Sequence, residues 1–400
     1  MLVNKRTIIF ITNYPFNEDY ARKYGFDILK KRGFDIVILN VFNFIYPEAV
    51  DKLPKYSKLE PVWNIEQVCV KSIKELERQL NSIRGWKIVF LKTAARIKLL
   101  RVLKRARIDY IKTFANIGPY FSCRNTFSNR YIHSIIRLIK NPFDFFLQSI
   151  VPRMPYPLLG IKHPKHIVLG SNLPGFVNPS PKTKIIHTHS YDYDRYLRNI
   201  NIHKPVFIPD EDYYVHLLNS PWALHDYVIL NIKPSVNKDE YKKIINNFLD
   251  FLEEKTKKRI LIAANPKATE DQNIYNGRPF SKNNTEQLVK YSSGVITHHT
   301  GAINFAVIHN KPICLISARK LDKNPFFHNC MHASSKALGL DINYIDTPED
   351  WRHIEDKGIF HYNPESYADY TKKYITLNKS EKRLHWDIIS DVLCDITPIK

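Results

Sequence analysis

Residues 294–316 constrain the fold more than any other part of the chain. An apolar run is followed by a polar turn, a short helical stretch, a Lys-Pro step and a second apolar run. This order is typical of two parallel strands joined by a short crossover helix. The turn contains His298, His299, Thr300 and Gly301. Open α/β sheets bind ligands where a strand ends and a helix begins, and free N–H groups there favour phosphate. The pattern therefore predicts a nucleotide or sugar-phosphate site at this turn.

The length of the chain, 400 residues, predicts two domains. A hydrophobic content of 44% is sufficient for packed cores and excludes global disorder. The five cysteines are scattered and form no CxxC pair, which argues against a disulfide framework and against a zinc site. We find no apolar segment typical of a signal peptide and no run near the ~18 residues that a membrane span needs. These features predict a cytoplasmic protein.

The chain is strongly basic, with 60 Lys and Arg against 39 Asp and Glu and a net charge of +21. Such an excess attracts a polyanion or an anionic surface. The basic residues concentrate in residues 87–165, and residues 97–108 combine helical apolar spacing with a basic face. A helix of this kind either lies on anionic lipid or packs against the core with its basic face in solvent. Because no recognition-module signature is present, we expect no nucleic-acid partner.

Strand and helix patterns alternate along the chain, which favours parallel sheets. The first half opens with a strand, a helical stretch and a strand, without the GxGxxG fingerprint, and the pattern pauses near residues 199–204. Strands are predicted at residues 7–12, 34–41, 86–91, 166–170, 184–189, 205–210, 259–264, 294–299, 311–317 and 342–345, and helices at 18–32, 237–257 and 284–291. The predicted domains are an N-terminal domain (1–203) with a basic helical insert (about 92–160), a C-terminal domain (204–365) and a helical tail (366–400) that packs back on the first domain.

Several polar residues near the predicted strands of the second half are candidates for binding a nucleotide donor. Asn265, Pro266 and Lys267 directly follow a buried strand, where the lysine would meet a phosphate. The alternative is a simple strand-terminating turn. Arg278 lies in the next loop and offers a planar fork for phosphate, unless the loop is only a surface turn.

The densest polar cluster of the sequence is found at residues 185–196. It contains three candidates for a general base, His189, Asp192 and Asp194. The two aspartates also match a DxD pattern, which holds a divalent metal in other sugar-transferring enzymes. Since a three-residue match is frequent by chance, we expect no metal. His298 and His299 are adjacent and face opposite sides of a strand, which argues against a shared metal ion.

Asp210 and Glu211 follow the strand predicted to open the second domain. Their carboxylates would contact the acceptor, orient a sugar hydroxyl or serve as a base, or they form a solvated acidic turn.

Residues 180–320 resemble the donor half of GT-B glycosyltransferases, most closely bacterial surface-polysaccharide enzymes of the sialyltransferase and Kdo-transferase type. In those families a His-Pro motif after one strand and a Ser/Thr-rich turn before a later helix hold the nucleotide and phosphate. Residues 264–267 stand at the first place here and residues 299–302 at the second. Asn265 replaces the family's histidine, and Gly301 stands where a second hydroxyl residue is common. An amide can donate to phosphate but cannot protonate a leaving group, a role that His298 or His299 would then take.

The resemblance implies an α/β fold with two Rossmann-like domains facing a cleft. It also implies an inverting, metal-independent transferase without a cofactor, acting in lipopolysaccharide or capsule synthesis. The donor would be a CMP-activated acidic sugar such as a nonulosonate or Kdo. The acceptor would be a glycan or a lipid-linked glycan at the inner face of the cytoplasmic membrane, to which the basic domain would bind peripherally. Two alternatives remain: a UDP-sugar transferase or UDP-sugar epimerase of the same fold, and a non-catalytic, membrane-associated assembly protein.

Overall fold

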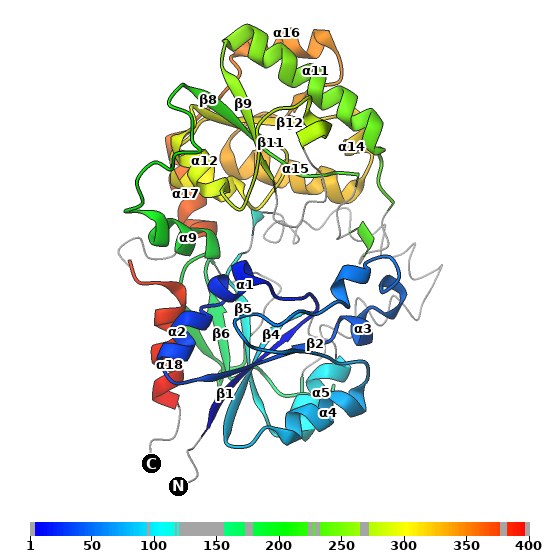
Figure 1. The fold of residues 1–400 in the computed structure, drawn as a ribbon, viewed down its shortest axis with the longest axis vertical. Helices are drawn as coiled ribbons and strands as arrows, with labels where there is room; N and C mark the ends of the chain where they lie inside the picture. Colours follow the sequence, from blue (N-terminus) through cyan, green and yellow to red (C-terminus); the bar gives the residue numbers. More distant parts are fainter. Residues whose placement is uncertain are drawn as a thin grey trace.

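The protein consists of two lobes stacked along its long axis, each built around a parallel sheet (Figure 1). The computed structural model describes residues 5–93, 97–116, 118–119, 156–172, 179–222, 227–228, 233–264, 272–376 and 382–396. Most of the predicted basic insert, and the predicted donor residues Asn265, Pro266 and Lys267, lie outside these ranges.

The first lobe contains a seven-stranded sheet in the order β3-β2-β1-β4-β5-β6-β7, with every neighbouring pair parallel. The interior strand β1 is buried on both faces: Ile8 and Phe10 face one core, and Ile9 and Ile11 face the other. A continuous apolar run is what a parallel strand covered on both faces requires. The strands are β1 (Arg6–Thr12), β2 (Asp35–Asn40), β3 (Gln67–Cys69), β4 (Trp86–Lys92), β5 (Asp109–Phe114), β6 (His166–Leu169) and β7 (Lys184–His187).

Helices cover both faces of this sheet, with α4 and α5 on one face and α2 with the C-terminal α18 (His385–Ile396) on the other (Figure 1). The remaining short helices of the lobe lie near its edges and connections. The elements are α1 (Glu18–Lys23), α2 (Phe26–Lys31), α3 (Phe42–Ile45), η1 (Pro47–Ala49), η2 (Pro54–Tyr56), α4 (Ile73–Ser82), α5 (Ile97–Arg105) and α9 (Tyr191–Asn199).

The basic amphipathic pattern of residues 97–108 belongs to α5, whose apolar face is buried in the first lobe. Leu99, Leu100, Val102 and Leu103 all lie in the core shared with α4. That face is therefore unavailable to lipid, and only the basic face is left for solvent or an anionic partner. None of the helices in the described ranges combines the length and the apolar character that crossing a membrane requires.

The second lobe contains a six-stranded parallel sheet in the order β10-β9-β8-β11-β12-β13. The strands are β8 (Tyr213–Leu217), β9 (Arg259–Ala264), β10 (Phe280–Lys282), β11 (Gly294–Thr297), β12 (Ile313–Ser317) and β13 (Asn343–Tyr344). The helices are α11 (Lys238–Thr256), η5 (Gln272–Tyr275), α12 (Thr285–Tyr291), α13 (Ile303–Ile308), α14 (Arg319–Asp322), α15 (Pro325–Leu338) and α16 (Pro348–Lys357).

The strand predicted at residues 205–210 is wrong, because these residues form turns and the lobe opens instead with β8. Pro205 and Pro209 cannot donate the ladder hydrogen bonds that a strand at this position needs. Val206 and Phe207, which suggested a buried strand, are exposed.

The end of the chain returns from the second lobe to the first. Helix α17 (Pro364–Tyr370) packs on α15, the π-helical turn η6 (Thr371–Ile375) follows, and α18 packs beside α2 (Figure 1). Trp386 of α18 is fully buried against Phe10 and Phe90, and its indole N–H donates to the Lys23 carbonyl at 2.9 Å. Gly25, which separates α1 from α2, has a φ of +62°, and a Cβ there would lie 2.2 Å from the Trp386 ring.

We expect Trp386→Ala to lower the free energy of unfolding by about 3–5 kcal/mol, as truncation of a large buried aromatic side chain leaves a cavity. Urea unfolding followed by circular dichroism measures the change. Phe207→Ala is the matched control, because the side chain of Phe207 is 49% exposed, and we expect a change within about 0.5 kcal/mol. Equal losses in the two variants would contradict the docking of α18 on the first lobe.

Candidate functional site

The two loops singled out in the sequence meet where the lobes join. Helix α9 follows β7, and the turn 298–301 follows β11, so each lies at the carboxyl edge of its sheet. Helix α9 packs against α13 and α12 of the second lobe. The structure thus brings the predicted base cluster and the predicted donor turn to one junction.

Asp192 lies on the first turn of α9 and bridges the two lobes. Its Oδ2 accepts hydrogen bonds from Asn304 Nδ2 of α13 at 2.7 Å and from Asn116 Nδ2, after β5, at 3.4 Å. Burial raises the pKa of the Asp192 carboxyl, and the nearby Lys23 and these amides act in the opposite direction. The side chain is only partly buried, so this carboxylate combines access to solvent with a raised pKa, as a general base requires.

Asn304 connects Asp192 to the turn 298–301. Its backbone N–H donates to the Gly301 carbonyl at 3.2 Å, and its Oδ1 accepts from the Tyr370 hydroxyl at 3.0 Å. Because Oδ1 accepts from a hydroxyl, the amide must turn its NH₂ group toward Asp192. The carboxylate therefore lies within one helical turn of Gly301.

The predicted donor residues of this turn differ in their access to a ligand. His298 is fully buried: its Nδ1–H donates to the Ile316 carbonyl at 2.6 Å, and its Nε2 accepts from the Tyr241 hydroxyl. Burial lowers the pKa of His298 to about 4, so the ring is neutral near pH 7. The prediction that His298 contacts the donor does not fit this position, because both ring nitrogens are occupied inside the core.

His299, Thr300 and Gly301 lie at the surface of the junction. The His299 ring is partly exposed, its Nδ1 lies 3.0 Å from Ser334 Oγ, and its carbonyl accepts from Asn219 at 2.6 Å. Burial lowers the pKa of His299 to about 4, which keeps the imidazole neutral. Gly301 is exposed, and a Cβ placed there would meet no atom of the other described residues within 4 Å, its two chain neighbours aside. This open space beside the turn is where a ligand can approach the backbone.

Lys92 is a polar residue of the junction that the sequence interpretation missed. It ends β4, and its Nζ donates to the Tyr191 hydroxyl and to Thr113 Oγ1, the latter at 3.3 Å. The ammonium also lies 4.4 Å from the centre of the Tyr24 ring. Burial lowers the pKa of the Lys92 amine well below its usual value. A lysine directly after the apolar run 88–91 was the available signal, since that position is the carboxyl edge of the sheet.

The other two predicted bases, Asp194 and His189, are engaged in holding the C-terminal segment. Asp194 accepts from the His385 backbone N–H at 2.6 Å and from Arg198 Nε at 3.3 Å. His189 is 1% exposed, and its Nε2 lies 2.8 Å from the Arg383 carbonyl. Neither side chain is free to reach an acceptor hydroxyl, because each is buried with its polar atoms occupied.

Three further predicted site residues lie at the opposite edge of the second sheet. Asp210 and Glu211 precede β8, and Arg278 precedes β10, whereas the turn 298–301 follows β11. Since all these strands are parallel, residues before a strand cannot meet residues after its neighbour. Arg278 instead pairs with Asp250 and Glu253 of α11, the latter at 2.7 Å, and Asp210 pairs with Lys204 at 2.9 Å.

No protein-family model matches the sequence, and neither does any curated protein. Among solved structures, the chain is similar to Staphylococcus aureus MnaA in complex with UDP, with 13% identity, 99% of this chain and 98% of that chain covered, and a TM-score of 0.50. It is also similar to Arabidopsis thaliana UGT89C1 complexed with UDP, with 10% identity, 98% and 99% coverage, and a TM-score of 0.50. The chain has the GT-B fold. The predicted fold class is thereby confirmed, whereas these similar structures do not single out the sialyltransferase or Kdo-transferase type.

We expect Asp194→Ala to cost about 2–4 kcal/mol of unfolding free energy, because it leaves the buried His385 N–H without its acceptor and removes one of the two carboxylates, Asp194 and Asp27, that pair with Arg198. The matched control is Asp192→Ala in the same helix, whose partners are uncharged amides at a partly exposed position, and we expect a loss below about 1 kcal/mol. Chemical denaturation of both variants measures the difference. Similar losses would contradict the structural role that we assign to Asp194.

Proposed function

We propose that the protein is a glycosyltransferase that moves a sugar from a nucleotide donor to a hydroxyl acceptor between its two lobes. The observation that supports this most strongly is the 2.7 Å hydrogen bond between Asp192 and Asn304. It places a carboxylate of the first lobe beside the turn of the second lobe at which a donor phosphate would bind. A reaction between two substrates needs the carboxyl edges of the two sheets to face each other, so that donor and acceptor meet. A protein that binds a single ligand does not need this arrangement.

On the donor side, the phosphate would lie in the open space at Gly301. The backbone N–H groups of Thr300 and Gly301 donate to no acceptor in the described part of the chain, so they are available to an anion. The Ser334 hydroxyl can donate to His299 Nδ1, which leaves Nε2 protonated and able to donate to a phosphate oxygen. Asn265 and Lys267, which follow β9 in the sequence, remain predicted contacts of the donor.

On the acceptor side, Asp192 would take the proton of the acceptor hydroxyl. The acceptor oxygen then bonds to the anomeric carbon of the donor sugar, and the bond from that carbon to the phosphate oxygen breaks. The nucleotide leaves with the electron pair, with N–H donors at the turn stabilising its charge. A single displacement inverts the anomeric configuration, and this step needs no metal ion or cofactor.

The donor proposed first is a UDP-sugar, because both of the similar structures described above contain UDP. A CMP-activated acidic sugar, the expectation from the sequence, is the second donor to compare. As acceptor we propose a glycan or lipid-linked glycan of the cell surface, with the basic outer face of α5 toward an anionic membrane. A UDP-sugar epimerase of the same fold would instead convert the donor without any acceptor.

We expect UDP to raise the melting temperature of the protein more than CMP or GDP at equal concentration, since a ligand that binds only the native state stabilises it. At about 100 times its dissociation constant, the ligand adds about 2.7 kcal/mol. Gly301→Leu should abolish the shift while leaving the unliganded melting temperature unchanged, because the new side chain fills open space.

Asn247→Leu is the matched control for this titration. It adds the same side chain at an exposed position of α11, and we expect the full nucleotide shift. Retention of the shift in Gly301→Leu would contradict the donor site. A larger shift with CMP would replace the UDP proposal and leave the transferase proposal in place.

We expect Asp192→Asn to lower kcat by about 10²–10⁴-fold, the usual contribution of a general base. In the wild type, activity should rise with pH through the pKa of Asp192, which burial holds above the usual value for aspartate, because only the deprotonated form accepts the proton. The variant should lose this acidic limb. Steady-state kinetics with a UDP-sugar and a panel of glycan acceptors tests both points.

Glu211→Gln is the control for the kinetic experiment, because Glu211 lies at the opposite edge of the sheet and is exposed. Its activity should equal that of the wild type. Full activity of Asp192→Asn would contradict the assignment of Asp192 as the base. Conversion of the donor sugar without an acceptor would identify an epimerase.

A further inference from the structure

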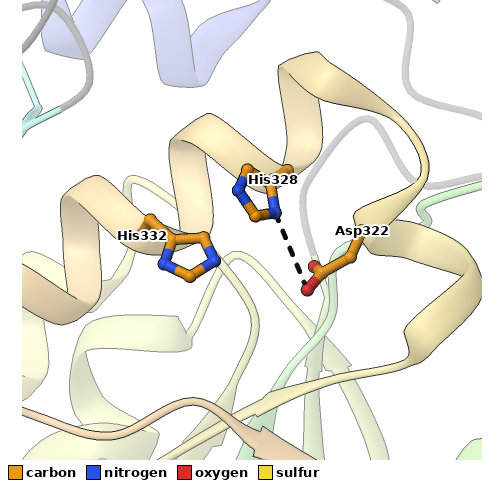
Figure 2. Close-up of side chains that lie close together, drawn as sticks. All are labelled: Asp322, His328 and His332. Carbon is orange, nitrogen blue, oxygen red and sulfur yellow. Dashed lines mark ion pairs between the residues drawn. The ribbon is translucent and has the colours of Figure 1, made fainter. Parts of the chain in front are cut away.

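Three side chains with metal-binding atoms converge where α14 ends and α15 begins. His328 and His332 project from one side of α15 toward Asp322, the last residue of α14 (Figure 2). Residues four apart on a helix share a face, and the two imidazole rings have their centres 4.0 Å apart. One ligand atom from each of the three residues lies within 4.8 Å of the other two.

The carboxylate of Asp322 is oriented by neighbours that are not part of this triad. Ser317 Oγ donates to its Oδ1 at 3.3 Å, and the Tyr344 hydroxyl donates to its Oδ2. The start of α15 is fixed as well, because the Asn324 side chain accepts from the Phe326 and Phe327 backbone N–H groups at 3.0 and 3.3 Å. Hydrogen-bonded carboxylates of this kind are typical of metal ligands.

We propose that Asp322, His328 and His332 bind a divalent transition-metal ion of the zinc class. Two imidazole nitrogens and one carboxylate oxygen are the donor set that such ions prefer over Mg²⁺ or Ca²⁺. With bonds of about 2.0–2.1 Å, ligand atoms around one tetrahedral ion lie roughly 3.4 Å apart, so the side chains close by about 1 Å on binding. The exposed His332 and the partly exposed His328 have the freedom to make this adjustment.

A salt bridge between His328 and Asp322 explains the positions of these three side chains less fully than a bound metal ion does. His328 Nδ1 lies 3.7 Å from Asp322 Oδ2, which accounts for one imidazole. The second imidazole lies against the first, with ring centres 4.0 Å apart, and this one ion pair does not account for its position. A metal ion binds one nitrogen of each ring and so accounts for both.

The site is separate from the proposed transfer step, since none of its ligands takes part in it. Met331 and Ser334, which contact His299, are both buried, whereas His328 is partly exposed and His332 is exposed. A pocket of about 420 Å³ opens beside His332 and is also lined by Tyr344 and His353. Water or a small anion can therefore approach His332 from this pocket.

The experiment uses the full chain with a purification tag that contains no histidine, stripped of metal and titrated with Zn²⁺ by calorimetry at pH 7.5. We expect one Zn²⁺ per chain in the wild type. His332→Ala and His328→Ala should each weaken binding at least about 100-fold, because loss of an outer-shell partner alone costs about 10–100-fold. Tyr344→Phe, which keeps all three ligands, should weaken it about 10-fold.

His353→Ala is the matched control, because His353 lines the same pocket and is not part of the triad. Its affinity for Zn²⁺ should equal that of the wild type, and circular dichroism verifies that each variant is folded. Replacing Zn²⁺ with Co²⁺ should give the visible absorption of a tetrahedral site in the wild type and not in His332→Ala. Absence of stoichiometric binding in the wild type, or equal losses in His332→Ala and His353→Ala, would overturn the proposal.

Discussion

The junction between the lobes depends on the C-terminal segment that returns to the first lobe. This segment contacts each partner of the junction: Tyr370 orients Asn304, the Ile375 carbonyl accepts from the Ser190 backbone N–H at 2.7 Å, and the His385 N–H binds Asp194. Burial of Trp386 in the first core stabilises the docked segment. The segment therefore aligns α9 with α13, and the Asp192–Asn304 hydrogen bond is a consequence of that alignment.

The parallel direction of all strands decides which polar residues can act together. Residues that follow β7 and β11 lie at the carboxyl edges, and α9 brings these edges together. Residues that precede a strand lie at the far edge, whatever their chemical suitability. Arg278 illustrates this, because its guanidinium suits a phosphate but pairs with the carboxylates of α11 instead.

The sequence predicted the strands that contain a continuous apolar run, such as β1, β4 and β11, because such a run indicates a buried strand. It did not predict β3 and β10, which have only three residues each and carry no periodicity of their own. The helix predicted over residues 18–32 is broken at Gly25, because the Trp386 ring occupies the space beside it. That contact joins residues more than 350 positions apart, and no local pattern encodes it.

The candidate site shows the same division between local and distant information. The polar cluster at residues 185–196 was recognised in the sequence, but the start of α9 was not. Without that start, the sequence could not decide whether Asp192 or Asp194 is the better candidate for the general base. Ser190 caps that helix by accepting from the Tyr193 N–H at 3.2 Å, and residues two apart on a helix point in different directions. A cap recognised at Ser190 would have separated the two carboxylates. It would not have revealed Asn304 or Asn116, which reach Asp192 from distant parts of the chain.

The two carboxylates of α9 differ in chemistry because their partners differ. Asp194 binds a guanidinium and a backbone N–H in the interior, so its carboxylate oxygens are used in holding the fold together. Asp192 receives two uncharged amide donors, which orient the carboxylate without the strong stabilisation of its charge that a paired arginine would give. Burial is therefore the largest influence on the Asp192 carboxyl, and it raises the pKa. A cation in place of Asn304 would stabilise the carboxylate and weaken the base, and it could not accept from the Tyr370 hydroxyl, so the amide is the side chain that permits both alignment and proton transfer.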